Sequence, residues 1–177
     1  MDLRVVTRPV RADDDARLAR MWPRLSMDSI YRRFHSPLRG LPPATVDHLV
    51  AVDHDLREAL VAVVGDEVVG VARYDRSPAD PDSAEFAVVV EDAWQGIGVG
   101  RQLLDELAAL AARRGVRRLT AIVQMDNDRM VWLIRRLLPG SRLTLDAGVY
   151  EVDSPLNAPA RPAVFPAEDT PRKDCPR

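Results

Sequence analysis

The sequence predicts an α/β fold built on one mixed sheet of about six or seven strands. Two apolar runs at 59–64 and 68–74 flank the turn-rich segment 65–67, which predicts an antiparallel hairpin. Further along, a strand at 84–90 is followed by a glycine-rich stretch, an amphipathic helix and a buried strand at 119–123. A strand, a helix and a strand in that order predict a right-handed parallel crossover, so the sheet is mixed.

The other elements follow from apolar periodicity and from capping residues. Apolar residues recur at helical spacing from Val99 to Arg114, and Gly115 is placed to end that helix. Ser26 is the expected N-cap of a short helix that ends near Phe34. The remaining predicted elements are a strand at 3–9, a helix from 13–15, a helix carrying Val46, Leu49 and Val50, a loop at 77–82, a helix at 128–138 and a hairpin at about 142–152 that turns at Ala147-Gly148.

Composition fits one globular domain with a loose end. Of the 177 residues, 46% are hydrophobic and 29% are charged, which is enough apolar material for a single sizeable core. Beyond residue 153 the pattern changes, because six prolines fall in the segment 154–177 with few apolar residues beside them. We expect residues 1–153 to form the folded domain and residues 154–177 to be a disordered, proline-rich tail.

Charge and cysteine content exclude several classes of protein. The 25 Lys and Arg against 27 Asp and Glu leave a net charge of -2, which gives no reason to expect nucleic acid or an anionic membrane as a partner. The lone Cys175 excludes an intrachain disulfide framework, and neither His48 nor His54 has partners at metal-ligand spacing, so no metal site is predicted. No apolar run reaches the ~20 residues of a membrane span, and the N-terminus lacks a secretory pattern. We expect a cytoplasmic protein.

The glycine-rich stretch suits a phosphate group. A turn between a strand and a helix presents unpaired backbone amides, and Gly96, Gly98 and Gly100 let an anion approach the backbone closely. From the glycines alone, a tight turn without a ligand remains an equal alternative. The spacing fits neither the Gly-x-Gly-x-x-Gly of dinucleotide folds nor the Gly-Lys-Ser/Thr ending of P-loop enzymes.

The segment Gln95-Gly96-Ile97-Gly98-Val99-Gly100 resembles the Gln/Arg-x-x-Gly-x-Gly/Ala signature of the Gcn5-related N-acetyltransferases (GNAT). The resemblance extends over about residues 3–153, because 84–90, 91–94 and 127–130 also fall at the family's spacing. Within that superfamily, the segments 31–34 and 84–87 look like the acetyltransferase domain of bacterial protein lysine acetyltransferases.

The resemblance implies a GNAT-like sheet that splays between the strands near 84 and 119, with acetyl-CoA inserted there. Backbone groups of 88–90 pair with the pantetheine arm, amides of 96–101 hold the pyrophosphate, and Asn127 contacts the pantetheine or orders the splayed strands. The residues thereby implied to bind acetyl-CoA are Val88, Val89, Val90, Gln95, Gly96, Ile97, Gly98, Val99, Gly100, Arg101 and Asn127.

The resemblance also implies direct attack by an amine, without an acyl-enzyme, and assigns Glu85 as the general base. A lysine amine has a pKa of ~10.4 in solution, so a base must remove its proton. If Phe86 and Val88 face one side of the sheet, Glu85 faces the other, and we expect desolvation among apolar neighbours to raise its pKa. The alternative is an exposed, inert carboxylate at a strand edge.

Two positions depart from the family pattern. Ile134 stands where many members have a tyrosine that protonates the leaving thiolate, so either the thiolate leaves unaided or another group serves. Leu138-Pro139-Gly140 replaces the usual Leu-Gly-Phe, which indicates a different acceptor pocket. His35 is interpreted as a capping or surface residue rather than as part of that pocket.

The acceptor is left open by the sequence. A protein lysine is the leading acceptor on the resemblance alone, and a small amine, an amino acid or an antibiotic is the enzymatic alternative. A non-catalytic acyl-CoA sensor would keep the phosphate loop but need no base.

Overall fold

The computed structural model describes residues 4–36, 38, 40 and 49–156. Its centre is a seven-stranded sheet in the order β1-β2-β3-β4-β5-β7-β6. Every neighbouring pair is antiparallel except β4 and β5, which are parallel. The strands are β1 Val6–Pro9, β2 Arg57–Val64, β3 Glu67–Ser77, β4 Asp80–Val90, β5 Arg118–Gln124, β6 Arg142–Asp146 and β7 Val149–Pro155. The predicted mixed α/β sheet is therefore confirmed.

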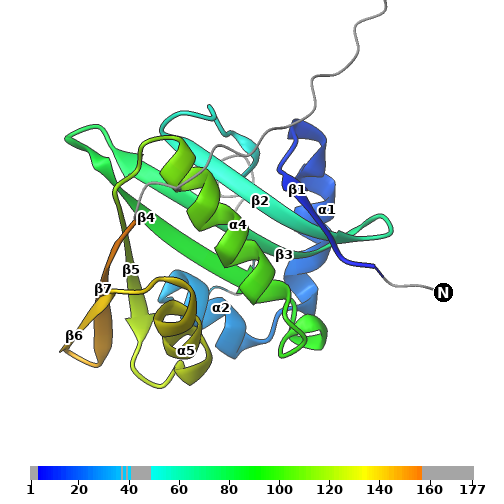
Figure 1. Ribbon diagram of the computed structural model, residues 1–177. Coiled ribbons are helices and arrows are strands. Elements are labelled where there is room, and N and C mark those ends of the chain that lie inside the picture. The colour runs from blue at the N-terminus through cyan, green and yellow to red at the C-terminus, as the bar shows by residue number, and fades with distance from the viewer. Residues whose placement is uncertain (1–3, 37, 39, 41–48, 157–177) are drawn as a thin grey trace, which may run out of the picture.

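Helices cover both faces of this sheet (Figure 1). The long helix α4 packs on β2, β3 and β4, while α1 packs on β3 and α2 packs on β4. The described helices are α1 Asp15–Met21, α2 Met27–Phe34, α4 Val99–Arg113 and α5 Asp128–Leu137, with short 3-10 turns η1 Ala12–Asp14, η2 Trp22–Arg24 and η3 Asp92–Trp94.

The core lies mainly between α4 and the sheet. Leu103, Leu104 and Leu107 form the apolar stripe of α4, are fully buried, and share a cluster with Phe86 of β4. Burial of each such side chain contributes about 1.5–3 kcal/mol. A second, smaller cluster joins α1 to the opposite face of β2 and β3. Because both faces of the central strands are buried, these strands read as nearly continuous apolar runs.

Predicted turns and caps are present at several places. Ser26 caps α2 by accepting a hydrogen bond from the Ser29 backbone amide. Gly115 follows α4 with a φ of +82°, the left-handed conformation expected of a residue that ends a helix. The β6–β7 hairpin turns at Ala147 and Gly148, whose φ values are +44° and +85°. Positive φ at both central positions is what a two-residue hairpin loop requires.

Two expectations about element limits are wrong. The predicted loop at 77–82 is mostly strand, because β3 runs to Ser77 and β4 begins at Asp80. Pro81 is tolerated there because it lies near the start of its strand. The expected boundary at residue 153 is also too early, since β7 continues to Pro155 and Ser154 is fully buried.

Two further expectations fall on residues that are not fully described. Most of the helix expected around Val46 lies outside the described residues, as does the tail from 157 onward.

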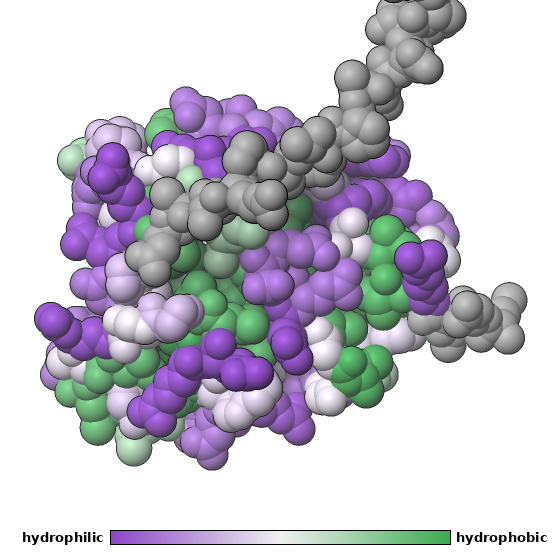
Figure 2. All heavy atoms as spheres, viewed as in Figure 1, coloured by the Kyte–Doolittle hydropathy of each residue, from purple (hydrophilic) through white to green (hydrophobic). Residues whose placement is uncertain are grey.

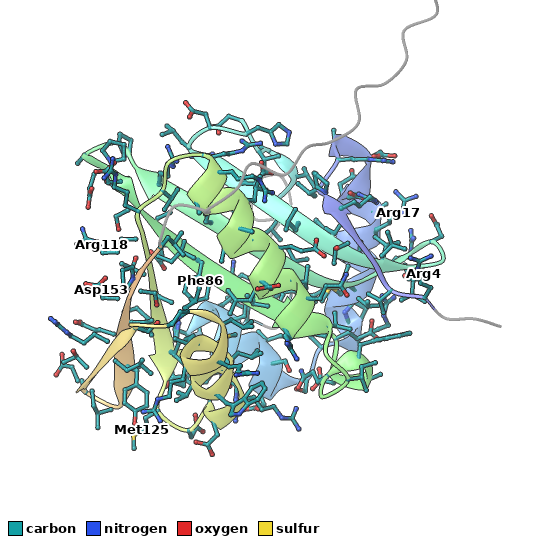
Figure 3. All side chains as sticks on the ribbon, viewed as in Figure 1. Arg4, Arg17, Phe86, Arg118, Met125 and Asp153 are labelled. Atoms are coloured by element: carbon teal, nitrogen blue, oxygen red, sulfur yellow. The ribbon has the colours of Figure 1, made fainter. Side chains whose placement is uncertain are left out.

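On the face of the molecule shown in Figure 2, polar and charged side chains cover much of the surface, and apolar ones gather at the β6–β7 hairpin. Figure 3 shows Arg118 of β5 beside Asp153 of β7 at this end of the sheet, where Arg118 Nε and an Asp153 carboxylate oxygen are 4.0 Å apart. No helix among the described residues is long and apolar enough to cross a bilayer.

Candidate active site

The sheet opens into a fork between β4 and β5. These strands pair only at Ser83 with Arg118, Ala84 with Leu119 and Glu85 with Thr120. Beyond those pairs β5 continues against β7, and no ladder between β4 and β5 is present in the described part of the chain. The edge of β4 from Phe86 onward is therefore left without a strand partner on its β5 side.

The backbone groups that face this fork can be identified from the register. The Glu91 amide donates to the Val69 carbonyl at 2.8 Å, so Glu91 and, by alternation, Val89 bond to β3. Val88 and Val90 lie between them and direct their backbone groups toward the fork. Val89 thus differs from its two neighbours, because its backbone belongs to the β3 ladder.

A wide groove of about 1190 Å³ follows the fork. Its walls come from α2, β4, the glycine-rich loop, β5 and α5. Most of the residues expected to bind acetyl-CoA line it, together with the expected base. These are Glu85, Val88, Val89, Val90, Gln95, Gly96, Gly98, Gly100, Arg101 and Asn127. Ile97, which is 67% exposed, and the buried Val99 belong to the same loop but do not line the groove.

The loop presents free amides at the mouth of this groove. Gly96 and Gly98 have φ values of +79° and +101°, which side-chain-bearing residues rarely adopt. Gly98 is the N-cap of α4, and its carbonyl accepts the Gln102 amide at 3.0 Å. The amides that precede Gln102 in the first turn have no acceptor within the helix, so they and the positive helix end are available to an anion.

The backbone conformation does not require glycine at position 100, unlike positions 96 and 98. The φ of Gly100 is not positive, and a Cβ there would make ordinary contacts with Val90 Cγ2 at 3.5 Å and Leu133 Cδ1 at 3.7 Å. The protein itself would thus accept alanine at this position.

Gln95 fixes the loop to the rest of the site. Its Nε2 donates to the Val90 carbonyl and to Ser29 Oγ, both at 3.0 Å, and its Oε1 accepts from Arg129 Nη1 at 2.7 Å. One side chain therefore joins β4, α2 and α5. The Val90 carbonyl is already occupied by this bond, which leaves the Val90 amide and the Val88 backbone groups for a ligand.

The wall of the groove formed by α2 is anchored to the same loop region by Asp92. Its carboxylate accepts from the Ser26 amide at 2.8 Å, from Ser26 Oγ at 2.7 Å and from Ser29 Oγ at 3.1 Å. Burial alone would raise the pKa of Asp92, but these hydrogen bonds outweigh it and lower the pKa below its ordinary value. The carboxylate stays ionised and holds the start of α2.

Asn127 has a structural task at the groove. Its Oδ1 accepts the Met130 amide at 3.2 Å, which caps α5, and lies 3.4 Å from Arg32 Nη1 of α2. Through these bonds Asn127 links the two helices that border the fork.

Glu85 lies at the fork, but its surroundings differ from those expected. Ala84 and Phe86 are buried under α4, so Glu85 faces the opposite, α2 side of the sheet, as the alternation predicts. The expected desolvation is wrong, however, because the Glu85 side chain is exposed in the groove. The reason is the fork itself, since the parting of β4 and β5 opens this position to water.

Sequence reasoning missed several residues of the site. Ser29, Arg32, Arg33 and Arg129 line the groove, and His35 does so as well. His35 also ends α2 with a φ of +52° and lies 3.0 Å from Gln124 Nε2 through its Nδ1. These α2 residues are distant in sequence from the glycine loop, so only the helical spacing of 29, 32, 33 and the pairing of α2 with β4 bring them together.

The position at which many family members have tyrosine is closed to the groove. Ile134 of α5 is fully buried in the main core and does not line the groove, and its hydrocarbon side chain has no proton to donate to a thiolate.

A forked mixed sheet with a glycine-rich loop of free amides between β4 and α4 is an arrangement that suits an acyl-CoA-dependent transferase. Residues 24–138 match the model of the Acetyltransferase (GNAT) family, and the chain belongs to that family. It is an acetyl-CoA-dependent N-acetyltransferase, as the motif in its glycine loop predicts.

Relatives agree with this assignment. An acetyltransferase of Pseudomonas aeruginosa is 30% identical over 130 residues, which cover 71% of this chain and 69% of that protein. The acetyltransferase Pat of Mycolicibacterium smegmatis is 33% identical over 151 residues, covering 84% of this chain but 45% of Pat. The solved GNAT domain of S. lividans PAT is 33% identical with a TM-score of 0.78, covering 85% of this chain and 89% of that domain.

Proposed function

We propose that this protein acetylates a lysine side chain of a protein substrate, with Glu85 as the general base. The observation that carries the proposal is the position of Glu85 at the point where β4 and β5 part, with its carboxylate open to the groove. A base at this point is within the same groove as the phosphate loop, so one ligand can extend from the loop to the carboxylate.

In this proposal acetyl-CoA binds with its pyrophosphate at the amides of 96–101, beside Arg101. The pantetheine arm then lies along β4 against the amide of Val90 and the backbone groups of Val88. This arrangement places the thioester toward Glu85.

The chemical step is a direct displacement. An acceptor ammonium gives its proton to the Glu85 carboxylate, and the freed amine attacks the thioester carbonyl. The bond between carbon and sulfur breaks and coenzyme A leaves as the thiolate, while the acylated nitrogen loses its second proton to water as the amide forms. Because Ile134 holds no proton, that thiolate takes its proton from water in the exposed groove.

Glu85 is exposed rather than buried, and its exposure also suits the proposed reaction. A carboxylate that is open to the groove can both orient the positively charged ammonium and receive its proton. The open groove also suits a side chain presented by a large protein better than a closed cavity would.

Two relatives support different acceptors. The similarity to Pat and to the S. lividans PAT domain favours a protein substrate. Mycothiol acetyltransferase of Thermobifida fusca is 37% identical over 105 residues, but these cover only 25% of that protein. A small amine is therefore the second candidate, favoured by this narrower similarity.

Release of free thiol from acetyl-CoA tests the proposal. The purified protein should release thiol with lysine-containing peptides, and mass spectrometry should find lysines in cell proteins whose acetylation disappears when the gene is deleted. Thiol release with small amines alone, and an unchanged set of acetylated proteins, would replace the protein lysine by the second candidate.

A further inference from the structure

Arg33 of α2 is a charged side chain that the proposed chemistry leaves without a task. It lines the groove and also a small apolar cavity of about 30 Å³ between α1, α2 and the sheet. Its guanidinium carbon lies 4.6 Å from the centre of the Phe34 ring. In the described part of the chain, no carboxylate or carbonyl forms an ion pair or a hydrogen bond with it.

Two carboxylates, Asp75 and Glu85, attract the charge of Arg33 without forming an ion pair with it. Asp75 accepts two hydrogen bonds from Arg73, at 2.9 and 2.8 Å, and Arg57 lies 3.7 Å from it. Glu85 is the second nearby carboxylate whose charge acts on Arg33. Arg33 thus adds a further positive charge on the same side of the sheet as the proposed base.

The surroundings of Arg33 are unfavourable for its charge. Burial, and then repulsion from Arg73, lower the pKa of Arg33 to about 10, although Asp75 and Glu85 act in the opposite direction. The guanidinium is still protonated at neutral pH. The side chain is only partly exposed, and a guanidinium held there without a hydrogen-bonded partner among the described residues is open to a ligand anion in the same groove.

We propose that Arg33 binds a carboxylate group of the acceptor, so that the preferred acceptor is an amine with a carboxylate close to it. This inference rests on the proposed function. The guanidinium fork suits a carboxylate, to which it can donate two parallel hydrogen bonds. The acceptor would then be held at both ends, with its ammonium at Glu85 and its carboxylate at Arg33.

Two sources of this carboxylate share the same chemistry. In a protein substrate it is an Asp or Glu side chain beside the target lysine. In a small substrate it is the carboxylate of an amino acid. The proposed function favours the first source, and the experiment distinguishes the two.

Matched acceptor pairs test the proposal. One pair consists of lysine peptides that differ only by Glu or Gln beside the lysine, and the other of an amino acid and its carboxamide. With the wild-type protein, kcat/KM should be about 10-fold or more higher for the carboxylate member of one pair, as expected for a charge-assisted bidentate contact. The pair that shows the preference identifies the source.

Variants of Arg33 then test whether this side chain causes the preference for the carboxylate acceptor. Arg33→Met keeps the apolar contact with Phe34 but removes the charge, and it should reduce the preference to about onefold by slowing the carboxylate acceptor more than the neutral one. Arg33→Lys should retain part of the preference. Arg20→Met is the matched control, because Arg20 lies on α1 in surface ion pairs with Asp66 and Glu67.

Several results would overturn the inference. One is a wild-type protein that does not distinguish the members of either pair. Another is an Arg33→Met variant that slows both members equally, which would show that Arg33 acts on Glu85 instead. If no amine releases thiol at all, the proposed function fails, and calorimetry decides the inference: the Glu peptide should bind the wild-type protein about 10-fold more tightly than Arg33→Met.

Discussion

Glu85 and Thr120 form the last pair in the parallel ladder between β4 and β5. One residue further along, the two strands no longer pair, and the groove begins. The carboxylate of Glu85 therefore lies at the apex of the fork, on the face of the sheet that α2 covers, while the glycine-rich loop follows the far end of the same strand.

Replacement of Glu85 by Gln should leave acetyl-CoA affinity unchanged and reduce turnover. General-base catalysis contributes about 100- to 10,000-fold, so a loss in that range is expected at neutral pH. Because the lysine amine has a pKa of ~10.4, raising the pH toward 10 should partly restore the variant. Steady-state kinetics across the pH range measure both effects, and wild-type turnover with an unchanged pH profile would exclude Glu85.

Replacement of Gly98 by Glu should weaken the binding of acetyl-CoA. The change places a carboxylate at the N-terminus of α4, where the pyrophosphate is proposed to bind, and loss of a few charge-assisted hydrogen bonds weakens binding more than about tenfold. Calorimetry measures the affinity. Gly65→Glu is the matched control, since Gly65 also has a positive φ, of +60°, but lies in the β2–β3 turn away from the groove. Equal affinity in folded Gly98→Glu and control proteins would refute the assignment.

Replacement of Gln95 by Leu should weaken acetyl-CoA binding without unfolding the protein. The variant loses the bonds to Val90, Ser29 and Arg129, so the loop is no longer held to β4, α2 and α5. We expect KM for acetyl-CoA to rise about 10-fold, as for loss of one or two strong hydrogen bonds. An unchanged KM would show that the loop keeps its conformation without Gln95.

Asp14 should make the stability of the fold depend on pH. Its side chain is fully buried and accepts from Arg8 at 2.6 and 2.7 Å, and these bonds lower the pKa of Asp14 below its ordinary value. The stabilisation is thus fully present above the unfolded pKa of about 3.9 and is lost as the pH falls through the lower folded value.

Asp14→Asn should accordingly reduce the free energy of unfolding by about 1–3 kcal/mol at pH 7. The difference from wild type should shrink below pH 4. Thermal unfolding at several pH values measures it, with Asp13→Asn as the control, because the Asp13 side chain is 74% exposed. A constant difference down to pH 2 would contradict the assignment.

Truncation after Leu156 should leave the fold stable, whereas truncation after Asp153 should destabilise it. Ser154 bonds Ser141 Oγ at 2.7 Å, and the Leu156 amide donates to the Arg117 carbonyl at 2.7 Å while its side chain packs against the main core. Circular dichroism on heating compares the two proteins, and equal melting temperatures would show that these contacts contribute little.

The periodic and local features of this protein follow from its sequence alone. The leucine stripe of α4, the Ser26 cap and the Ala147-Gly148 turn depend on neighbours within a few residues, so spacing was sufficient to predict them. The turn at 95–100 is also local, because positive φ at Gly96 and Gly98 depends on consecutive residues, and its binding of a phosphate stays a prediction.

Only the tertiary structure decided which distant side chains share the groove and how much water reaches them. Alternation along β4 predicts which face Glu85 is on, but its exposure depends on where β4 and β5 part, and that is set by the pairing of β5 with β7. The same holds for Arg33, because an arginine in a helix sequence is ordinary. Only the packing of α2 on β4 places it near Glu85 without an ion-pair partner among the described residues. Burial and charge neighbourhood are properties of the packed chain, and they arise from contacts between segments that lie far apart in the sequence.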